Sequence, residues 1–481
     1  MLDLRKRAAS GAKWSGASTM IVTLLELVQL VVLARLLTPQ DFGLMAMVMV
    51  FLVFAQSFAD MGVSAAIIHR QDITRRQLSS LYWLTLLSGV IVAALFVMVS
   101  PLIVLFYQET SLQSLLLCIA LVFVIGSIGQ QFEILMQKHL MFKRLAFIDS
   151  SASSFGVCSA ILFAWLGFGV WSLVWGRLIS VSVRSGILSW YGFNHWQPQL
   201  YFSFKEIKEF IGFGMFQMGD RCVNYFNQRV DQLLIGSLLG AQALGFYSLA
   251  FNLVIQPISK INPLFTRVAF PVFAKINTDN ERLRHGFMTL RNLLSTINAP
   301  LLLGLFAIAP TLIPFFFGEQ WAPSIELLQL LVLVAFFRSM GNPIGSLLLA
   351  KGRADLGFKW NVALFFIQLP VLYFATKIYG VTGAIVALLV LELVYFPVEY
   401  QFLIKKLIGR CFSDYLSSAS RAFFIALLMT MAVMAIPLFF ELSLLALLIA
   451  QIVLGALIYV TMYWLFFPVP MKKLIHLIVN K

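Results

Sequence analysis

Long hydrophobic stretches follow one another along the chain, with short polar segments between them. A helix of about 20 residues crosses the hydrocarbon core of a membrane, and only helices and closed barrels satisfy their backbone hydrogen bonds there. The stretches are about twice as long as a barrel strand, so each predicts a transmembrane helix. Fourteen spans are predicted, at residues 15–37, 42–64, 79–101, 112–136, 147–166, 170–190, 209–238, 243–266, 289–317, 324–349, 357–378, 381–403, 420–440 and 443–467.

The composition supports this pattern. Of the 481 residues, 60% are hydrophobic and 12% are charged, which leaves too little polar surface to cover a soluble globule. The predicted fold class is all-α integral membrane, with no soluble domain. Gly-rich phosphate loops, metal-spaced His clusters and nucleophile elbows are absent from the sequence, so it predicts no cofactor, no metal and no enzyme activity.

Basic residues predict the orientation. When the loops are assigned alternately to two sides, Lys and Arg fall almost entirely on one side, with Arg35 and Lys377 as the exceptions near the other. Because Lys and Arg are retained on the cytoplasmic face, both termini are expected in the cytoplasm. The net charge of +14 then reflects loops that face anionic lipid headgroups rather than a nucleic-acid partner.

The chain also repeats itself at an offset of 202 positions. The stretch at residues 28–51, "VQLVVLARLLTPQDFGLMAMVMVF", returns at residues 230–253 as "VDQLLIGSLLGAQALGFYSLAFNL". The shared positions are Leu36, Leu37, Gln40 and Gly43 with Leu238, Leu239, Gln242 and Gly245. This offset carries the first span onto the seventh, a step of six helices that preserves orientation. The sequence therefore predicts two parallel six-helix lobes around a central cavity, residues 1–200 and 201–410, with two helices appended at 411–481.

Polar residues line one face of the seventh span at steps of three and four residues. A polar face of this kind is not expected to contact lipid. The first span carries Glu26 and Gln29 at positions that the offset maps onto the same face. We expect both spans to line the cavity, the seventh through Asp220, Asn224, Gln228 and Asp231.

Cations within the predicted spans are costly to bury and are candidates for function. We expect Arg177, Arg221 and Arg338 to line the cavity, with Arg184 and Lys260 nearer the cytoplasmic entrance. A structural alternative is that these arginines only brace the helices.

Buried acids offer partners for that bracing. The candidates are Glu26, Asp220, Asp231 and Glu392. We favour structural pairing for Asp220, while Asp231, Glu392 and Glu26 could instead carry a coupling proton or sodium ion.

Five segments carry a resemblance to a known family: "SGAKWS", "LARLLTPQDFGLMA", "GQQFEILMQKHLMF", "FTRVAFPVFAKI" and "FRSMGNPIGSLLLAKGRADLGFKWN". With them the whole chain resembles the polysaccharide flippases of the multidrug/oligosaccharidyl-lipid/polysaccharide exporter superfamily, closest to the colanic-acid exporter type. Phe337 stands where that pattern leads us to expect Leu.

The resemblance implies transport by alternating access. The expected cargo is an oligosaccharide repeat unit on undecaprenyl diphosphate, carried across the bacterial inner membrane for surface polysaccharide such as exopolysaccharide or lipopolysaccharide. A polysaccharide polymerase and export machinery would be further partners. A diphosphate crossing a low-dielectric region needs buried cations and a polar lumen, which agrees with the cations found in the spans.

Two rival functions can be weighed. A multidrug exporter of the same superfamily would share the lobes, but cationic drugs prefer acidic and aromatic sites over buried bases. A membrane polymerase or ligase acting on the same glycolipid would need a sizeable periplasmic loop for its catalytic residues, and every predicted periplasmic connection is short.

The predicted topology can be tested by cysteine accessibility. Single cysteines introduced near Gln108, Ala241 and Glu319 are expected to react with a membrane-impermeant maleimide from the periplasmic side. Reaction only from the cytoplasmic side would show that the topology is wrong.

Overall fold

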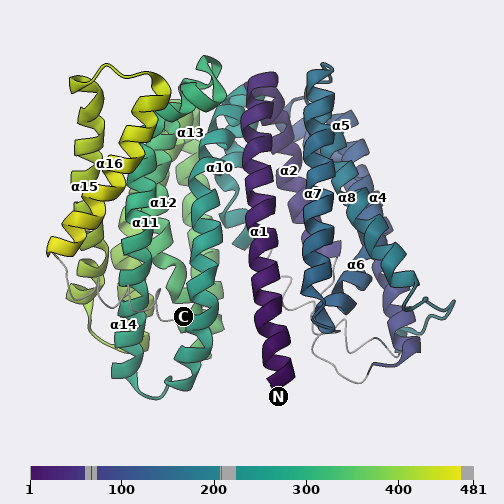
Figure 1. Cartoon of the computed structure of the whole chain (residues 1–481). Helices are drawn as coiled ribbons and strands as arrows, with labels where there is room; N and C mark the ends of the chain where they lie inside the picture. Colours follow the sequence, from purple (N-terminus) through teal and green to yellow (C-terminus); the bar gives the residue numbers. More distant parts are fainter. Residues whose placement is uncertain (1, 60–66, 68–72, 206, 208–223, 467–481) are drawn as a thin grey trace. The chain divides into compact units, whose positions relative to one another are not determined.

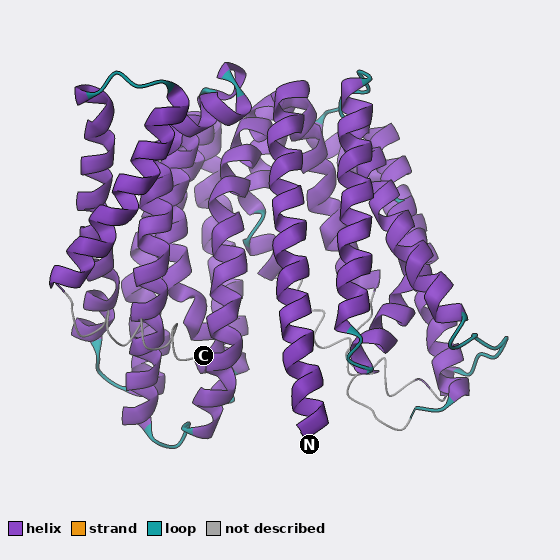
Figure 2. Ribbon diagram, in the orientation of Figure 1, coloured by secondary structure: helices purple, strands orange, loops and turns teal. Residues whose placement is uncertain are grey.

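Helices joined by loops make up the protein. The computed structural model describes residues 2–59, 67, 73–205, 207 and 224–466, and within these ranges it contains no strand (Figure 2). In this part of the chain, eleven helices are long and apolar enough to cross a membrane. The all-helical membrane fold is therefore confirmed, and the count of fourteen spans remains a prediction.

Two compact units divide the chain, Met1–Gly245 and Phe246–Lys481. Unit 1 contains the helices α1 (Leu2–Leu36), α2 (Pro39–Ala59), α4 (Arg75–Tyr107), α5 (Leu112–Ile119), α6 (Leu121–Lys138), α7 (Phe142–Trp165) and α8 (Trp171–Phe193), labelled in Figure 1. Helix α10 (Val230–Lys275) continues from unit 1 into unit 2. Unit 2 then contains α11 (Asn280–Phe317), α12 (Pro323–Ala350), α13 (Ala354–Glu399), a π-helix (Tyr400–Ile404), α14 (Lys405–Ile408), α15 (Phe412–Phe439) and α16 (Leu444–Phe466). The lobe boundaries near residues 200 and 410 remain predictions.

The two longest helices each break at a glycine. Gly240 in α10 has φ 83° and ψ −178°, and Gly380 in α13 has φ 67° and ψ −152°. Glycine adopts these angles because it has no Cβ to clash with the backbone. Each break lies in the short gap between two neighbouring predicted spans.

Small residues let α6, α7 and α8 approach closely. A Cβ added to Gly156 of α7 would lie 2.7 Å from Cβ of Ser180 in α8, and one added to Gly129 of α6 would lie 2.8 Å from Cα of Ser185. Without a hydrophobic force between helices in lipid, close backbone packing of this kind holds them together. A long polar side chain on α8 can therefore reach both neighbouring helices.

The basic loops of unit 1 gather at one end of its helices. The Lys143 ammonium lies 5.1 Å from the ring centre of Trp14, and the Arg144 guanidinium lies 4.5 Å from that of Tyr191. These contacts join the N-terminal part of α1, the first turn of α7 and the end of α8. The start of α4 is bonded to the segment after α8, so it lies at the same end.

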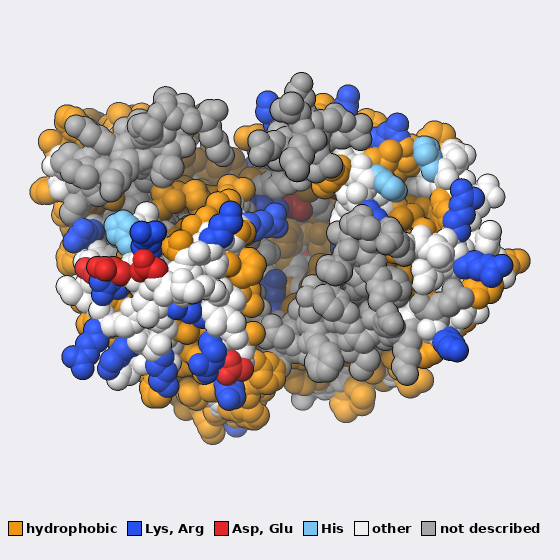
Figure 3. Space-filling view, turned by 90° about the horizontal axis from the view of Figure 1, so that it is seen from below, with side chains coloured by type: hydrophobic (Ala, Val, Ile, Leu, Met, Phe, Trp, Pro, Cys, Tyr) orange, Lys and Arg blue, Asp and Glu red, His pale blue; other side chains and the backbone are white. Residues whose placement is uncertain are grey.

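Unit 2 shows the same arrangement. The Lys351 ammonium donates to the Asn277 carbonyl at 2.6 Å, and Arg284 Nη1 donates to the Arg410 carbonyl at 3.4 Å. The turns after α10, α12 and α14 therefore lie together at one end, and Lys and Arg side chains are numerous on the face seen from below (Figure 3). Within each unit the structure confirms that basic loops collect at one end. Which side of the membrane that end faces remains a prediction.

Candidate functional site

Most of the predicted site residues lie in the described part of the chain, distributed over both units. In unit 1, α8 carries Arg177 and Arg184, α1 carries Glu26 and Gln29, and Asp231 lies in the first turn of α10. Asn224 and Gln228 lie just before α10, and unit 2 holds Lys260, Arg338 and Glu392. Asp220 and Arg221 lie outside the described residues.

Arg184 forms an ion-pair network with two acids in unit 1. Its Nη1 and Nη2 donate to the two carboxylate oxygens of Glu133 at 2.9 and 2.8 Å, and its Nε donates to Asp149 Oδ1 at 2.9 Å. The planar guanidinium fork matches a carboxylate in this bidentate geometry. The close packing of α6, α7 and α8 makes the reach possible. Two carboxylates thus neutralise Arg184, which favours a bracing role for this side chain.

The acids of this network were missing from the predicted site. Glu133 lies within the fourth predicted span and Asp149 near the start of the fifth, so an acid within a span was the available signal. What the sequence could not show is that α6 and α7 both pack against the face of α8 that carries Arg184.

Arg177 lies two turns before Arg184 on the same face of α8. Its Nε is buried and has no hydrogen-bond partner among the described residues. The charged groups that act on it are Arg184 and Glu26, the latter contributed by α1. Arg177 therefore presents a donor that the described protein groups leave unused, beside one acid and a second cation.

Polar residues of the predicted seventh span bond to one another near the start of α10. Gln228 Nε2 donates to Asn224 Oδ1 at 3.1 Å. Asp231 is 2% exposed, and its Oδ1 accepts from the backbone N–H of Gln232 at 2.8 Å. Asn224 and Gln228 thus form an exposed hydrogen-bonded pair, whereas Asp231 is buried.

Arg338 and Glu392 form a pair in unit 2. Arg338 Nε on α12 donates to Glu392 Oε1 on α13 at 2.9 Å, and their side chains are 30% and 17% exposed. The sequence named Glu392 as a bracing partner or ion-coupling acid, and the structure brings it to Arg338. Lys260 is exposed on α10.

The predicted site lacks one buried cation. Arg291 lies near the start of the predicted span 289–317, and it is fully buried in α11. Its Nη1 donates to the Met340 carbonyl at 2.8 Å, and its guanidinium carbon lies 3.7 Å from the ring centre of Tyr415. Glu399 acts on it electrostatically. Arg291 therefore holds α11, α12, α13 and α15 together, and a contact partner such as Tyr415 is not visible in the sequence.

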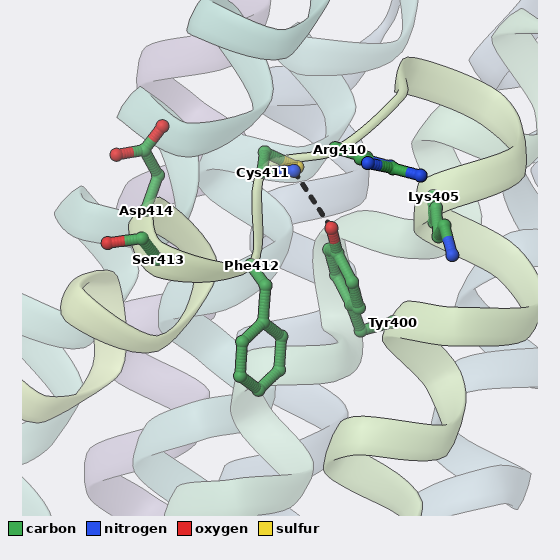
Figure 4. Close-up of a pocket in the computed structure, with 7 residues that line it drawn as sticks. All are labelled: Tyr400, Lys405, Arg410, Cys411, Phe412, Ser413 and Asp414. Carbon is green, nitrogen blue, oxygen red and sulfur yellow. Dashed lines mark hydrogen bonds between the residues drawn. The ribbon is translucent and has the colours of Figure 1, made fainter.

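A cavity of about 400 Å³ opens at the basic end of unit 2, between α14 and α15. Lys405 and Arg410 lie on one side of Tyr400, and Ser413 and Asp414 on the other (Figure 4). The Tyr400 hydroxyl accepts from the backbone N–H of Cys411 at 2.8 Å, which fixes the turn between the helices. The lining of the cavity carries both positive and negative side chains. We therefore do not add its cations to those predicted to bind cargo.

Comparisons with known proteins place these features in a family. A family model described as "Polysaccharide biosynthesis protein" matches residues 32–326. "Lipopolysaccharide biosynthesis protein WzxC" of Escherichia coli (strain K12) is 35% identical over 426 residues, which cover 89% of this chain and 87% of that protein. "Teichuronic acid biosynthesis protein TuaB" of Bacillus subtilis (strain 168) is 40% identical over 364 residues, 75% of each chain.

A solved structure shares the fold. The lipid II flippase MurJ, in an inward closed conformation, matches with a TM-score of 0.77 over 94% of this chain and 98% of its own. The sequences are 15% identical, so this likeness concerns the fold alone.

Arg291 provides a test of the packing around it. Replacing Arg291 by Ala is expected to lower the free energy of unfolding by about 3–5 kcal/mol, because Glu399 loses the cation that faces it. Arg291→Lys keeps the charge but loses the planar group that stacks on Tyr415, so it should restore only part of the stability. Thermal unfolding of the detergent-purified protein measures the effect.

Arg282→Ala is the matched control for this test, because the Arg282 side chain is 79% exposed on the same helix. Equal stability of the Arg291→Ala and Arg282→Ala variants would contradict the bracing role.

Proposed function

The chain belongs to the polysaccharide biosynthesis protein family, and we propose that it is a flippase for a lipid-linked oligosaccharide. The proposed cargo is a repeat unit on undecaprenyl diphosphate, moved across the cytoplasmic membrane by alternating access for surface polysaccharide biosynthesis. The observation that carries the proposal is the match to relatives named for lipopolysaccharide and teichuronic acid biosynthesis over most of the chain. The fold shared with a lipid II flippase supports it.

The proposed layout has fourteen spans, with two six-helix lobes around a central cavity and two appended helices. It is supported by hydropathy, by the 202-residue repeat and by the breaks at Gly240 and Gly380 between neighbouring spans. We place the protein in the bacterial inner membrane with both termini in the cytoplasm, because basic loops are retained on that side. A polysaccharide polymerase and export machinery are proposed as further partners.

Arg177 is the described cation best suited to hold the anionic part of the cargo. Burying a guanidinium costs several kcal/mol unless an anion or water receives it, and its Nε has no partner among the described groups. A guanidinium binds two phosphate oxygens at once. Arg221 and Arg338 are proposed to share the role. For Arg338 this requires its hydrogen bond to Glu392 to break, so that the guanidinium can bind a cargo phosphate instead.

Arg184 and Lys260 are proposed to lie nearer the cytoplasmic entrance of the cavity. The two acids on Arg184 make it a brace that fixes the face of α8 on which Arg177 stands. We propose that Gln29, Asn224 and Gln228 line the path of the sugars.

The positions of the acids do not identify the coupling ion. Glu26 lies beside Arg177, and Asp231 and Glu392 lie in unit 1 and unit 2 respectively. Each could balance a buried cation or bind a proton or sodium ion, and transport measured against a pH or sodium gradient would separate these roles.

The rival functions fit less well. Multidrug export would need a site for cations, whereas the buried Nε of Arg177 offers a hydrogen-bond donor to an anion. Membrane polymerases and ligases are enzymes, whereas the solved structure that shares this fold is a lipid II flippase.

The proposal is tested by deleting the gene in a host that has no second flippase for the same glycolipid. Surface polysaccharide is expected to disappear while lipid-linked repeat units accumulate on the cytoplasmic leaflet. Leaflet-resolved labelling of the glycolipid measures the distribution. Normal translocation in the deletion strain would contradict the proposed flippase function.

A further inference from the structure

Two glycines of the repeat lie at a backbone contact. Gly43 in the first copy and Gly245 in the second occupy equivalent positions, and both are buried. A Cβ built on Gly43 would overlap the carbonyl oxygen of Ala241, and one built on Gly245 would overlap that of Pro39. Any larger residue at either position must therefore push the two backbones apart.

The contact is reciprocal within unit 1. Pro39 and Ala241 are equivalent under the same offset of 202 positions that relates Gly43 to Gly245. Each copy of the repeat therefore offers a carbonyl oxygen to the glycine of the other copy. This is the self-complementary geometry of a two-fold contact, in which the same patch is used twice.

The contact lies at the end of unit 1 away from the basic loops. Pro39 begins α2 immediately after α1, and Ala241 follows the break at Gly240. The same end holds the turn between α7 and α8, because the Val170 N–H donates to Asp41 Oδ1 at 3.0 Å. If the basic loops face the cytoplasm, this contact lies at the periplasmic end.

We infer that Gly43 and Gly245 are positioning residues of the transport cycle whose contact closes the periplasmic end while cargo loads from the cytoplasm. Alternating access requires that the two ends are not open together. Two backbones in direct contact leave no passage between them. The contact also contains no interlocked side chains at the glycines, and Cα–H···O contacts are weak, so the segments can part when cargo leaves.

The inference rests on the proposed transport function and is tested first without a transport assay. The four native cysteines are replaced, and a single cysteine is introduced at Met47, which is fully buried one turn from Gly43 in α2 and packs against Gly236 of α10. A membrane-impermeant maleimide is added from the periplasmic side. Gly43→Ala and Gly245→Ala are each expected to raise the labelling rate about tenfold, because a Cβ at the contact favours the state in which the segments are apart.

Gly186→Ala in α8 is the matched control, because a Cβ there meets no atom within 4 Å. It should leave the labelling rate unchanged. Both contact variants should respond alike, since the contact is reciprocal. An unchanged rate in either contact variant present at normal level in the membrane would overturn the inference, as would an equal rise in Gly186→Ala.

A crosslinking experiment tests the inference if the glycine variants do not reach a measurable level in the membrane. Cysteines at Gln40 and Gln242, which are equivalent in the repeat, are joined by a bifunctional thiol reagent with a reducible spacer. Translocation of the lipid-linked oligosaccharide is expected to fall about tenfold on crosslinking and to return on reduction. Full translocation by crosslinked protein would overturn the inference that this contact opens during transport. Absent translocation in the protein without the crosslink would instead count against the proposed function, and the labelling result would still decide the contact.

Discussion

An arginine inside a membrane span must be matched by an anion, an aromatic face or water, and this requirement organises the packing of both units. In unit 1, Arg184 is matched by Glu133 and Asp149 because small residues bring α6 and α7 against α8. In unit 2, Arg291 is matched by the Tyr415 ring and the Met340 carbonyl. The helices that carry these charges cannot slide independently, so each unit behaves as a braced bundle.

The same requirement separates bracing cations from those free to bind cargo. A guanidinium held by two carboxylates has little left to offer a diphosphate, whereas Arg177 keeps a buried Nε that the described protein groups do not use. Bracing also serves function, since a fixed α8 holds Arg177 in one place. Transport then needs a part of the protein that moves, and the glycine contact of the repeat supplies one without breaking the braces.

Hydropathy predicted the all-helical membrane fold because crossing a membrane depends on local composition. The breaks at Gly240 and Gly380 lie between predicted spans for the same reason. Partners were harder to predict. The Arg184 network depends on which helices pack against α8, and Arg291 lies near a predicted span end, where position along the chain does not show burial. The repeat identified Gly43 and Gly245 as equivalent, but only the fold shows that each touches the other copy.

The contrast between Arg177 and Arg184 tests the central claim most directly. Arg177→Gln and Arg184→Gln are compared for protein level in the membrane and for translocation of lipid-linked oligosaccharide per molecule in proteoliposomes. Arg177→Gln is expected to reach the normal level and to lose at least about 90% of translocation, equivalent to about 1.4 kcal/mol or more. Arg184→Gln should lower the protein level, because Glu133 and Asp149 are left without their cation. Normal translocation by a well-expressed Arg177→Gln variant would contradict the claim that this cation holds the cargo.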